Sequence, residues 1–159
     1  MMISRDTLKP IIMLEYLSDQ MLDQLVPIAE LLQFETEEFI FKQGEPANRF
    51  YMLLQGKVLL EQHITSKITV SLSAIKPRYS FGWSAILDKA TYSTNAICVE
   101  QSQLLSFRAE KLKMLFETNH SLGYIITQRI LHIIKKRYDI RTEQFIKVIE
   151  HHPDISILL

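Results

Sequence analysis

The chain has 159 residues, of which 18 are Lys or Arg and 18 are Asp or Glu, so its formal net charge is zero. Only 4 Gly and 5 Pro are present and 47% of the residues are apolar, which excludes collagen-like and disordered chains and suits one domain with a real core. The single cysteine, Cys98, can form no internal disulfide and cannot hold an iron–sulfur cluster, which favours a reducing compartment.

The N-terminal residues show no targeting signal. The short apolar run from Ile11 to Leu14 is too brief for a signal-peptide core, and no stretch approaches the roughly 20 apolar residues that span a bilayer. We therefore expect a cytoplasmic protein with no membrane partner.

A helix is expected from Ser18, which is a good N-cap residue and is followed by apolar residues at helical spacing. Pro27 marks a kink or break within this pattern. The apolar positions are Met21, Leu22, Leu25, Ile28, Ala29 and Leu32.

From Phe34 the chain changes to short segments rich in aromatic and β-branched residues. Turn signals separate these segments at intervals of roughly ten residues, a rhythm typical of a β-sandwich or barrel. The turns are Gly44-Glu45-Pro46, Gln55-Gly56-Lys57, Thr65-Ser66-Lys67 and Lys76-Pro77-Arg78. Alternation from Ile68 to Ala74 predicts a strand with one buried face, and residues 92–99 and 103–107 look like two more strands.

A second helical zone is expected from about Ala109 to about His151, with a break at Asn119-His120. The expected fold class is therefore α+β: an antiparallel β-barrel with an N-terminal helix and a long C-terminal helix. We divide the chain into an N-terminal segment (1–17), a β-barrel with flanking helices (18–118), and a C-terminal helix and tail (119–159).

Phe41 to Val58 and Phe81 to Leu87 are the residues that carry a resemblance to a known family. The first run reads as a strand, a Gly-acidic turn at Gly44, a Tyr-bearing strand and a second turn at Gly56. This pattern resembles the cyclic-nucleotide-binding domain of the catabolite-activator and kinase-regulatory-subunit superfamily. The resemblance implies a jelly roll, or double-stranded β-helix, and places Phe81 to Leu87 at the family's phosphate-binding cassette.

The cassette has a physical logic of its own. Gly82 allows a sharp turn out of a strand, and Trp83 to Leu87 can form one helical turn. Free N–H groups at such a turn, including those of Ser84 and Ala85, would make an anion site. The resemblance also implies an acidic residue directly after the Phe-Gly pair, for the ribose, and an arginine further along, for the cyclic phosphate.

Both of those charged side chains are missing from this sequence. Trp83, the only tryptophan, stands at the acidic position, and Thr94 stands where the arginine belongs; a shift of one residue gives Ser93 or Asn95. Losing a charge-assisted contact costs about 1.5–3 kcal/mol, so we expect no ordinary binding of cyclic AMP. Arg78 or Lys89 could still reach a phosphate from another direction.

Two interpretations of the pocket stay open. In one, a cyclic nucleotide or another small anionic effector binds there; in the other, Trp83 blocks an empty pocket. We expect no other cofactor. The candidate ligand-binding residues are Phe81, Gly82, Trp83, Ser84, Ala85, Thr94 and Asn95.

The C-terminal helix carries a second candidate site, a homodimer interface. Its apolar residues repeat at alternating three- and four-residue steps, and the resemblance implies pairing with a second copy. The candidate interface residues are Leu122, Ile126, Ile130, Ile133 and Arg137. Alternatively, this helix packs only within its own chain.

Direct control of transcription and enzymatic activity are not expected. Only 19 residues follow Ile140, too few for the DNA-reading domain that transcription factors of this superfamily carry, and Lys135-Lys136-Arg137 is a weak nucleic-acid signal. We expect no metal site, since His63 is the only histidine in the strand region. A haem ligand at His63 or His120 is a remaining alternative, and Cys98 is expected to be a small core residue.

The sequence therefore predicts a non-catalytic regulatory module that senses a ligand and acts on an unidentified protein. The alternative is a ligand-free pseudo-sensor that serves as a dimerising interaction domain.

Overall fold

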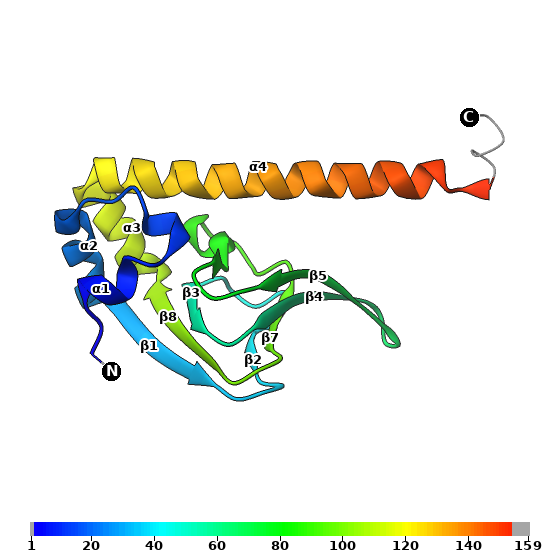
Figure 1. The fold of residues 1–159 in the computed structure, drawn as a ribbon, viewed down its shortest axis with the longest axis horizontal. Coiled ribbons are helices and arrows are strands. Elements are labelled where there is room, and N and C mark those ends of the chain that lie inside the picture. Colours follow the sequence, from blue (N-terminus) through cyan, green and yellow to red (C-terminus); the bar gives the residue numbers. More distant parts are fainter. Residues whose placement is uncertain (1, 154–159) are drawn as a thin grey trace. The chain divides into compact units, whose positions relative to one another are not determined.

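The computed structural model describes residues 2–153. These residues form two compact units, one ending at Ile125 and the other beginning at Ile126. The first unit contains all the strands, and the second contains the greater part of the last helix (Figure 1).

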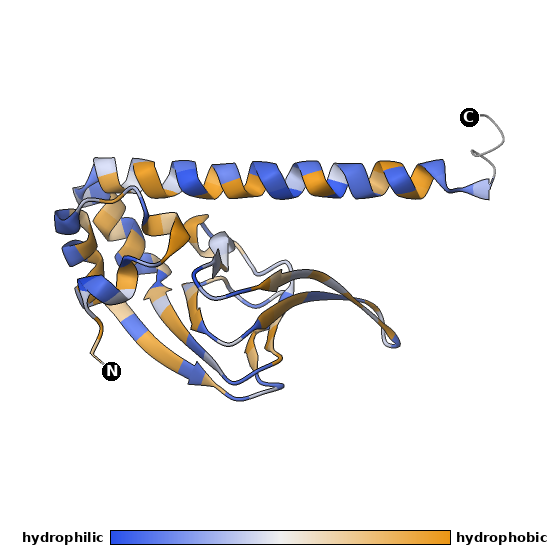
Figure 2. Cartoon of the chain, viewed as in Figure 1, coloured by the Kyte–Doolittle hydropathy of each residue, from blue (hydrophilic) through white to orange (hydrophobic). Residues whose placement is uncertain are grey.

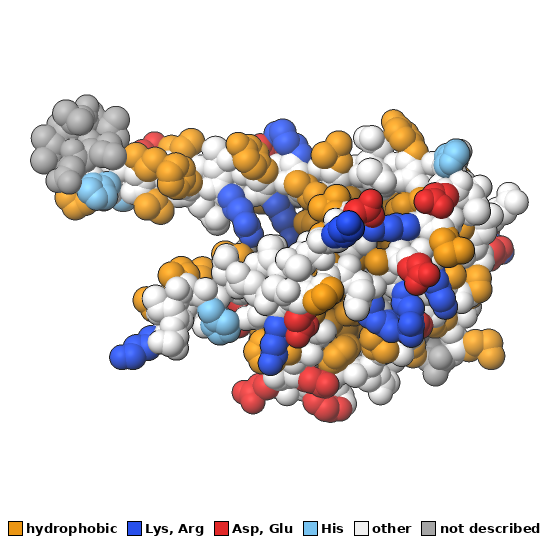
Figure 3. Space-filling view, turned by 180° about the vertical axis from the view of Figure 1, so that it is seen from behind, with side chains coloured by type: hydrophobic (Ala, Val, Ile, Leu, Met, Phe, Trp, Pro, Cys, Tyr) orange, Lys and Arg blue, Asp and Glu red, His pale blue; other side chains and the backbone are white. Residues whose placement is uncertain are grey.

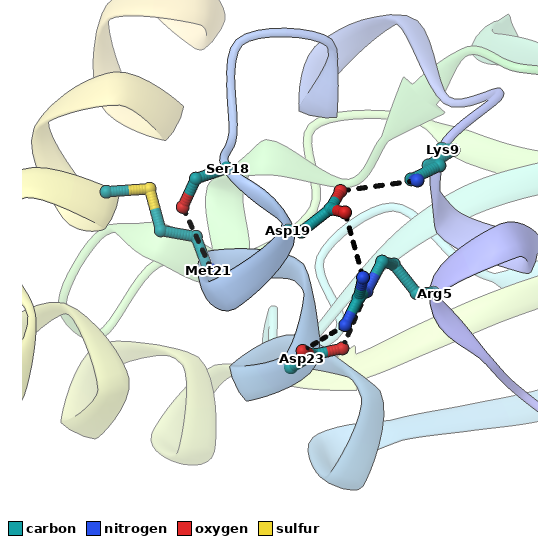
Figure 4. Close-up of polar contacts among 6 residues, drawn as sticks. All are labelled: Arg5, Lys9, Ser18, Asp19, Met21 and Asp23. Atoms are coloured by element: carbon teal, nitrogen blue, oxygen red, sulfur yellow. Dashed lines mark hydrogen bonds and ion pairs between the residues drawn. The ribbon is translucent and has the colours of Figure 1, made fainter.

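The N-terminal segment is more structured than the sequence indicated. It forms a short helix α1 (Arg5–Leu8) and a 3₁₀ turn (Ile12–Leu14) before helix α2 (Asp19–Leu25). The predicted cap is confirmed, since Ser18 Oγ accepts a hydrogen bond from the Met21 N–H at 3.3 Å. Arg5 reaches both Asp19 and Asp23, and Lys9 also contacts Asp19 (Figure 4), so ion pairs join α1 to α2. Lys9 and Arg5 hold the pKa of the Asp19 carboxyl below its usual value.

The prediction that the first helix continues to Leu32 is wrong. A 3₁₀ turn (Val26–Ile28) containing Pro27 ends α2, and strand β1 (Ala29–Phe34) follows at once. All six residues of β1 pair with β8 (Ser102–Arg108), in a register that runs from Ala29 opposite Phe107 to Phe34 opposite Ser102. Pairing with a distant strand therefore overrides the local helical spacing.

Eight strands form two four-stranded antiparallel sheets, which confirms the predicted α+β jelly-roll class. The first sheet has the order β1-β8-β3-β6 and the second the order β2-β7-β4-β5. The remaining bounds are β2 (Phe39–Phe41), β3 (Arg49–Gln55), β4 (Val58–Thr65), β5 (Ile68–Ile75), β6 (Ser80–Phe81) and β7 (Asn95–Cys98).

The large side chains buried in the first unit come from both sheets and from the N-terminal segment. These side chains form one apolar core, so the two sheets and the N-terminal helices stabilise one another by packing. They include Leu8, Met13, Leu25, Phe50, Leu53, Ile75, Phe81, Leu104 and Phe107.

The β4–β5 hairpin differs from expectation in its burial. The strand at Ile68–Ile75 is confirmed, but Ile68 and Val70 are exposed rather than buried. The reason is length: β7 pairs only with Val58–Glu61 of β4, so the outer half of the hairpin extends past its neighbour in the sheet. In Figure 1 this half projects from the barrel as a two-stranded arm.

Strands β1, β3 and β8 are also joined through side chains at one end of their sheet. Glu30 of β1 binds Arg49 Nη1 at 2.8 Å and Arg108 Nε at 2.9 Å. Arg49 Nη1 also donates to Ser106 Oγ at 2.8 Å. Arg49 and Arg108 hold the pKa of the Glu30 carboxyl below its usual value, so Glu30 stays ionised near neutral pH.

The C-terminal helices follow the predicted boundaries. Helix α3 (Ala109–Thr118) and helix α4 (His120–Glu150) are separated at Asn119, whose side-chain oxygen accepts a hydrogen bond from the Leu122 N–H at 3.0 Å. A Cβ at Gly123 would lie 2.9 Å from Cβ of Phe116, so the glycine lets the first turn of α4 pack closely on α3. Apolar and polar residues alternate along the whole of α4 (Figure 2).

The two turn glycines that flank β3 offer a matched test of the fold. Gly44 and Gly56 both have positive φ, +87° and +92°, but only Gly56 is crowded: an added Cβ would lie 2.5 Å from the Gln101 carbonyl oxygen and still closer to Ser102.

We predict that Gly56→Ala lowers the free energy of unfolding by roughly 2–4 kcal/mol, because backbone strain and steric overlap add together. Gly44→Ala introduces only the backbone strain of a positive φ, so we expect it to lower the free energy of unfolding by about 1 kcal/mol. Urea denaturation of both variants measures the difference, and equal losses would contradict the close approach of residues 56 and 101–102.

Candidate functional site

The predicted cassette forms the turn that the sequence indicated. Phe81 ends β6, Gly82 adopts a left-handed conformation with φ +78°, and Trp83–Ile86 make one 3₁₀ turn. A Cβ at Gly82 would lie 3.1 Å from a ring carbon of Tyr51 and 3.3 Å from the carbonyl oxygen of Arg49. Glycine therefore serves both the conformation and the close packing of the turn on β3.

The backbone donors of this turn are fewer than predicted. The Ala85 N–H donates to the Gly82 carbonyl at 3.1 Å, so it is not free for an anion as we expected. The reason is the tight i to i+3 bonding of a 3₁₀ turn, which uses an amide that an α-helix would leave open. Ser84 precedes the first bond of the turn, and its amide has no partner within the turn.

Four aromatic rings pack behind the cassette. Phe41 of β2 stacks on Tyr92 with ring centres 3.7 Å apart, and Tyr51 stacks on Phe81 with centres 5.3 Å apart. Phe41 also lies 5.8 Å from Tyr51, so the two pairs form one cluster between the sheets. This cluster brings Phe81, a predicted site residue, into a buried position with 0% exposure.

Tyr92 is the residue of this region that the sequence analysis missed. Its hydroxyl donates to the Arg49 carbonyl at 2.6 Å and accepts from the Arg49 N–H at 3.2 Å. Its ring also lies 3.6 Å from the position of a Cβ at Gly82. Burial raises the pKa of Tyr92, and burial together with the nearby Tyr92 raises the pKa of Tyr51, so both phenols stay neutral at physiological pH. An aromatic residue in the loop before β7 was the available signal.

Thr94 and Asn95 lie just beyond Tyr92. The strand predicted over residues 92–99 is shorter, because residues 91–94 bend and pair with the Gly44 loop: the Gly44 N–H donates to the Tyr92 carbonyl at 2.8 Å. Asn95 is buried and its side-chain oxygen accepts from the Gln43 N–H at 2.8 Å. That oxygen therefore holds a loop in place, whereas Thr94 is half-buried.

The residues present fit a cyclic nucleotide only in part. The backbone turn at Gly82 remains, but Trp83 supplies no carboxylate and Thr94 no guanidinium. Of the alternative cations, Arg78 donates from Nε to the Pro10 carbonyl at 2.7 Å, and Lys89 lines a different pocket. The carboxylate and the guanidinium that the resemblance implied are thus absent from their expected positions, and a phosphate contact by the Arg78 Nη groups stays a prediction.

The candidate dimer residues all belong to α4. Leu122, Ile126, Ile130, Ile133 and Arg137 fall on one stripe of the helix by their spacing. Leu122 lies in the first unit and the other four lie in the second. Leu122, Ile126 and Ile130 are buried within the chain, and Ile133 and Arg137 are half-buried. Other apolar side chains of α4, among them Leu131 and Tyr138, are exposed. Figure 3 shows hydrophobic side chains along the surface of the helix. The interface stays a prediction.

Within the described residues, no group of three His, Cys, Asp or Glu is placed to hold a metal ion. His63 sits on the exposed hairpin, where its Nδ1 lies 2.7 Å from Thr69 Oγ1. Cys98 is fully buried, and burial raises the pKa of its thiol, which is the opposite of an activated nucleophile. None of the helices in residues 2–153 has the length and apolarity needed to cross a bilayer.

We predict that Tyr92→Phe lowers the free energy of unfolding by about 1–2 kcal/mol, because it leaves the half-buried N–H and carbonyl of Arg49 without the Tyr92 hydroxyl as a partner. Tyr79→Phe is the matched control; Tyr79 is exposed, and a change within about 0.5 kcal/mol is expected. Thermal or urea denaturation measures both, and a Tyr92→Phe variant as stable as the wild type would argue against the hydroxyl bridge.

Comparison with known proteins agrees with this geometry. The Global nitrogen regulator of Nostoc sp. is 25% identical over 127 residues, which are 79% of this chain and 54% of the regulator, so the chain spans about half the length of that curated relative. A Geobacter metallireducens protein whose name refers to cyclic nucleotide binding has a solved structure that is 26% identical, with a TM-score of 0.74, over 86% of this chain and 99% of that one.

The Catabolite Activator Protein of Thermus thermophilus has the same fold at 20% identity, with a TM-score of 0.73 over 87% of this chain and 63% of that chain. A family model described as the cyclic nucleotide-binding domain matches residues 31–119, which include the barrel, the cassette and α3. The chain therefore belongs to the cyclic nucleotide-binding domain family.

Proposed function

We propose that this chain is a non-catalytic sensor module whose barrel takes a small anionic effector by contacts other than those used for cyclic AMP in the family. The observation that carries the proposal is the cassette itself. Gly82 keeps its left-handed turn against Tyr51, while Trp83 and Thr94 stand in place of the two charged residues.

A route from the cassette toward the C-terminal helix supports a signalling role. The 3₁₀ turn Trp83–Ile86 packs against α3. Lys113 of α3 donates to the Leu87 carbonyl at 3.2 Å and pairs with Asp88 at 2.6 Å, so the end of the cassette is tied to this helix. α3 in turn leads into α4 through Asn119. An effector with different affinities for two positions of the turn would shift these helices.

We predict that one compound from a panel of cyclic mononucleotides, cyclic dinucleotides and small carboxylates or phosphates raises the melting temperature of the chain. A ligand at 100 times its Kd stabilises the folded state by about 2.7 kcal/mol. The same compound is expected to change the fluorescence of Trp83, because this is the only tryptophan and it lies in the cassette.

A Trp83→Phe variant is the control for that panel, because it removes the fluorescence signal and keeps an aromatic side chain, so its melting temperature should still respond. Absence of any thermal or fluorescence response across the panel would overturn the sensor proposal and favour the ligand-free alternative.

That alternative is a dimerising interaction domain, and the exposed apolar side chains of α4 favour it. A single copy leaves large apolar residues in water along the helix, which marks a surface that another molecule covers. These residues include Tyr124, Leu131, Ile134, Tyr138, Ile140 and Phe145. Most of these exposed residues lie on a different face of α4 from the predicted stripe, whose Leu122, Ile126 and Ile130 are already buried within the chain. A twofold dimer through the stripe therefore stays a separate proposal.

We predict that the wild type is a homodimer and that Ile133→Asp raises the Kd for dimerisation about a hundredfold or more, because a carboxylate then has to enter an apolar interface. His132→Asp adds the same charge at an exposed position about 100° around α4 from both Ile133 and Leu131, and should leave the dimer intact. Light scattering coupled to gel filtration measures the mass, and circular dichroism checks that α4 stays helical. A monomeric wild type, or equal effects of the two variants, would contradict the interface.

A further inference from the structure

A pocket of about 410 Å³ opens on the first unit, outside the barrel interior. Three segments that are distant in sequence form it: the loop leading into β3, the loop after the cassette, and the first turn of α3. Its lining residues are Pro46, Ala47, Asn48, Arg49, Leu87, Lys89, Ala90, Arg108, Ala109, Glu110 and Lys113. Its volume lies within the range of small-molecule binding sites.

Positive charge dominates the pocket. Four of its lining residues are cations, Arg49, Lys89, Arg108 and Lys113, against the single carboxylate of Glu110, which gives a formal charge of +3. The remaining residues are small or apolar apart from Asn48. Glu30 and Asp88 lie outside the lining and pair with Arg49, Arg108 and Lys113, so the local excess falls from +3 to +1 when both are counted. The lining itself still favours a negatively charged occupant.

The two arginines keep hydrogen-bond donors available. Arg49 uses Nη1 for both Glu30 and Ser106, and the structure gives Nε and Nη2 no partner within residues 2–153. Arg108 uses Nε for Glu30 and likewise keeps its two Nη groups. The Lys89 ammonium makes no ion pair with the described residues. A guanidinium fork with free N–H groups is well suited to a phosphate or carboxylate.

The arginine at the inner end of this cluster is also held in place. The Arg49 side chain is only 23% exposed, and Glu30 and Ser106 fix its guanidinium from one side. The Tyr92 hydroxyl fixes the Arg49 main chain through both its N–H and its carbonyl. Because this donor is ordered before any ligand arrives, an anion would lose less free energy in immobilising it.

From this combination we propose that the pocket is a second ligand site, separate from the barrel, that binds a small anion with two or more negative charges, such as a phosphate compound or a di- or tricarboxylate. Arg49 and Arg108 donate to one anionic group. Lys89 approaches from the loop after the cassette, and Lys113 remains tied to Asp88 and Leu87.

Binding at this site bears on the cassette. The ligand would bridge the loop that holds Leu87 and Lys89 to the start of α3, the same two elements that Lys113 already joins. Occupancy should therefore restrain the end of the cassette, although the site does not depend on the barrel binding any effector.

The experiment is a titration of the ¹⁵N-labelled full chain with inorganic pyrophosphate and, separately, with citrate, followed by amide chemical shifts at constant ionic strength. We expect saturable shifts at residues 46–49, 87–90 and 108–113. A larger response to pyrophosphate assigns the site to phosphate compounds, and a larger response to citrate assigns it to carboxylates. Linear shifts that sodium chloride reproduces would overturn the proposal.

Lys89→Gln is the test variant because Lys89 is exposed and its loss disturbs no ion pair of the described fold. It should weaken the binding of the better anion about tenfold. Lys111→Gln is the matched control, because it removes the same charge. Lys111 is exposed near the start of α3 and does not line the pocket. Equal weakening by both variants would show general charge attraction and would also overturn the proposal.

A hexaglutamate peptide is the third ligand in the titration. Tighter binding of the peptide than of either small anion, with shifts that extend beyond the pocket, would replace the proposed metabolite with an acidic protein segment. The two proposals are tested by different signals. Amide chemical shifts of residues 46–49 and 108–113 report binding in the pocket, whereas Trp83 fluorescence reports binding in the barrel.

Discussion

The pairing of β8 with strands on both of its sides is the constraint on which the rest of the molecule depends. β8 joins β1 to β3, and β3 carries β6, the strand that leads into the cassette. Glu30 reinforces this order from β1 by binding both Arg49 and Arg108. Because Tyr92 and a Cβ-free Gly82 then pack on the end of β3, the positions of the cassette and of the outer cationic pocket both follow from the pairing of these three strands.

Much of the fold could be predicted from local signals, and the errors have a common physical cause. Gly44, Gly56 and Gly82 identified turns because each needs a positive φ that other residues rarely adopt. Helical spacing extends to Leu32, but the residues from Ala29 form β1, because their pairing with β8 joins segments that are far apart in the sequence. Alternation likewise predicts a buried Ile68, which is exposed. The alternation of apolar and polar residues carries no information on how far the neighbouring strand extends.

The candidate site was predicted less completely than the fold. Its position followed from the Phe81-Gly82 pair, but a free amide at Ala85 depends on whether the turn is 3₁₀ or α, which local sequence does not determine. The roles of Tyr92 and Arg49 depend on a contact between the loop before β7 and the first residue of β3, which are distant in the sequence. We propose that the family scaffold and its ligand contacts are separable in this chain: the glycine turn and the aromatic packing are present, whereas Trp83 and Thr94 supply neither of the charges that the resemblance implied.

Isothermal titration of cyclic AMP into the wild-type chain, beside a Trp83→Glu, Thr94→Arg double variant, tests this separation most directly. The account predicts no saturable binding by the wild type at micromolar concentrations and a gain of binding by the double variant. Micromolar binding of cyclic AMP by the wild type would contradict it, because the cassette would then hold the nucleotide without the charged side chains whose absence defines it.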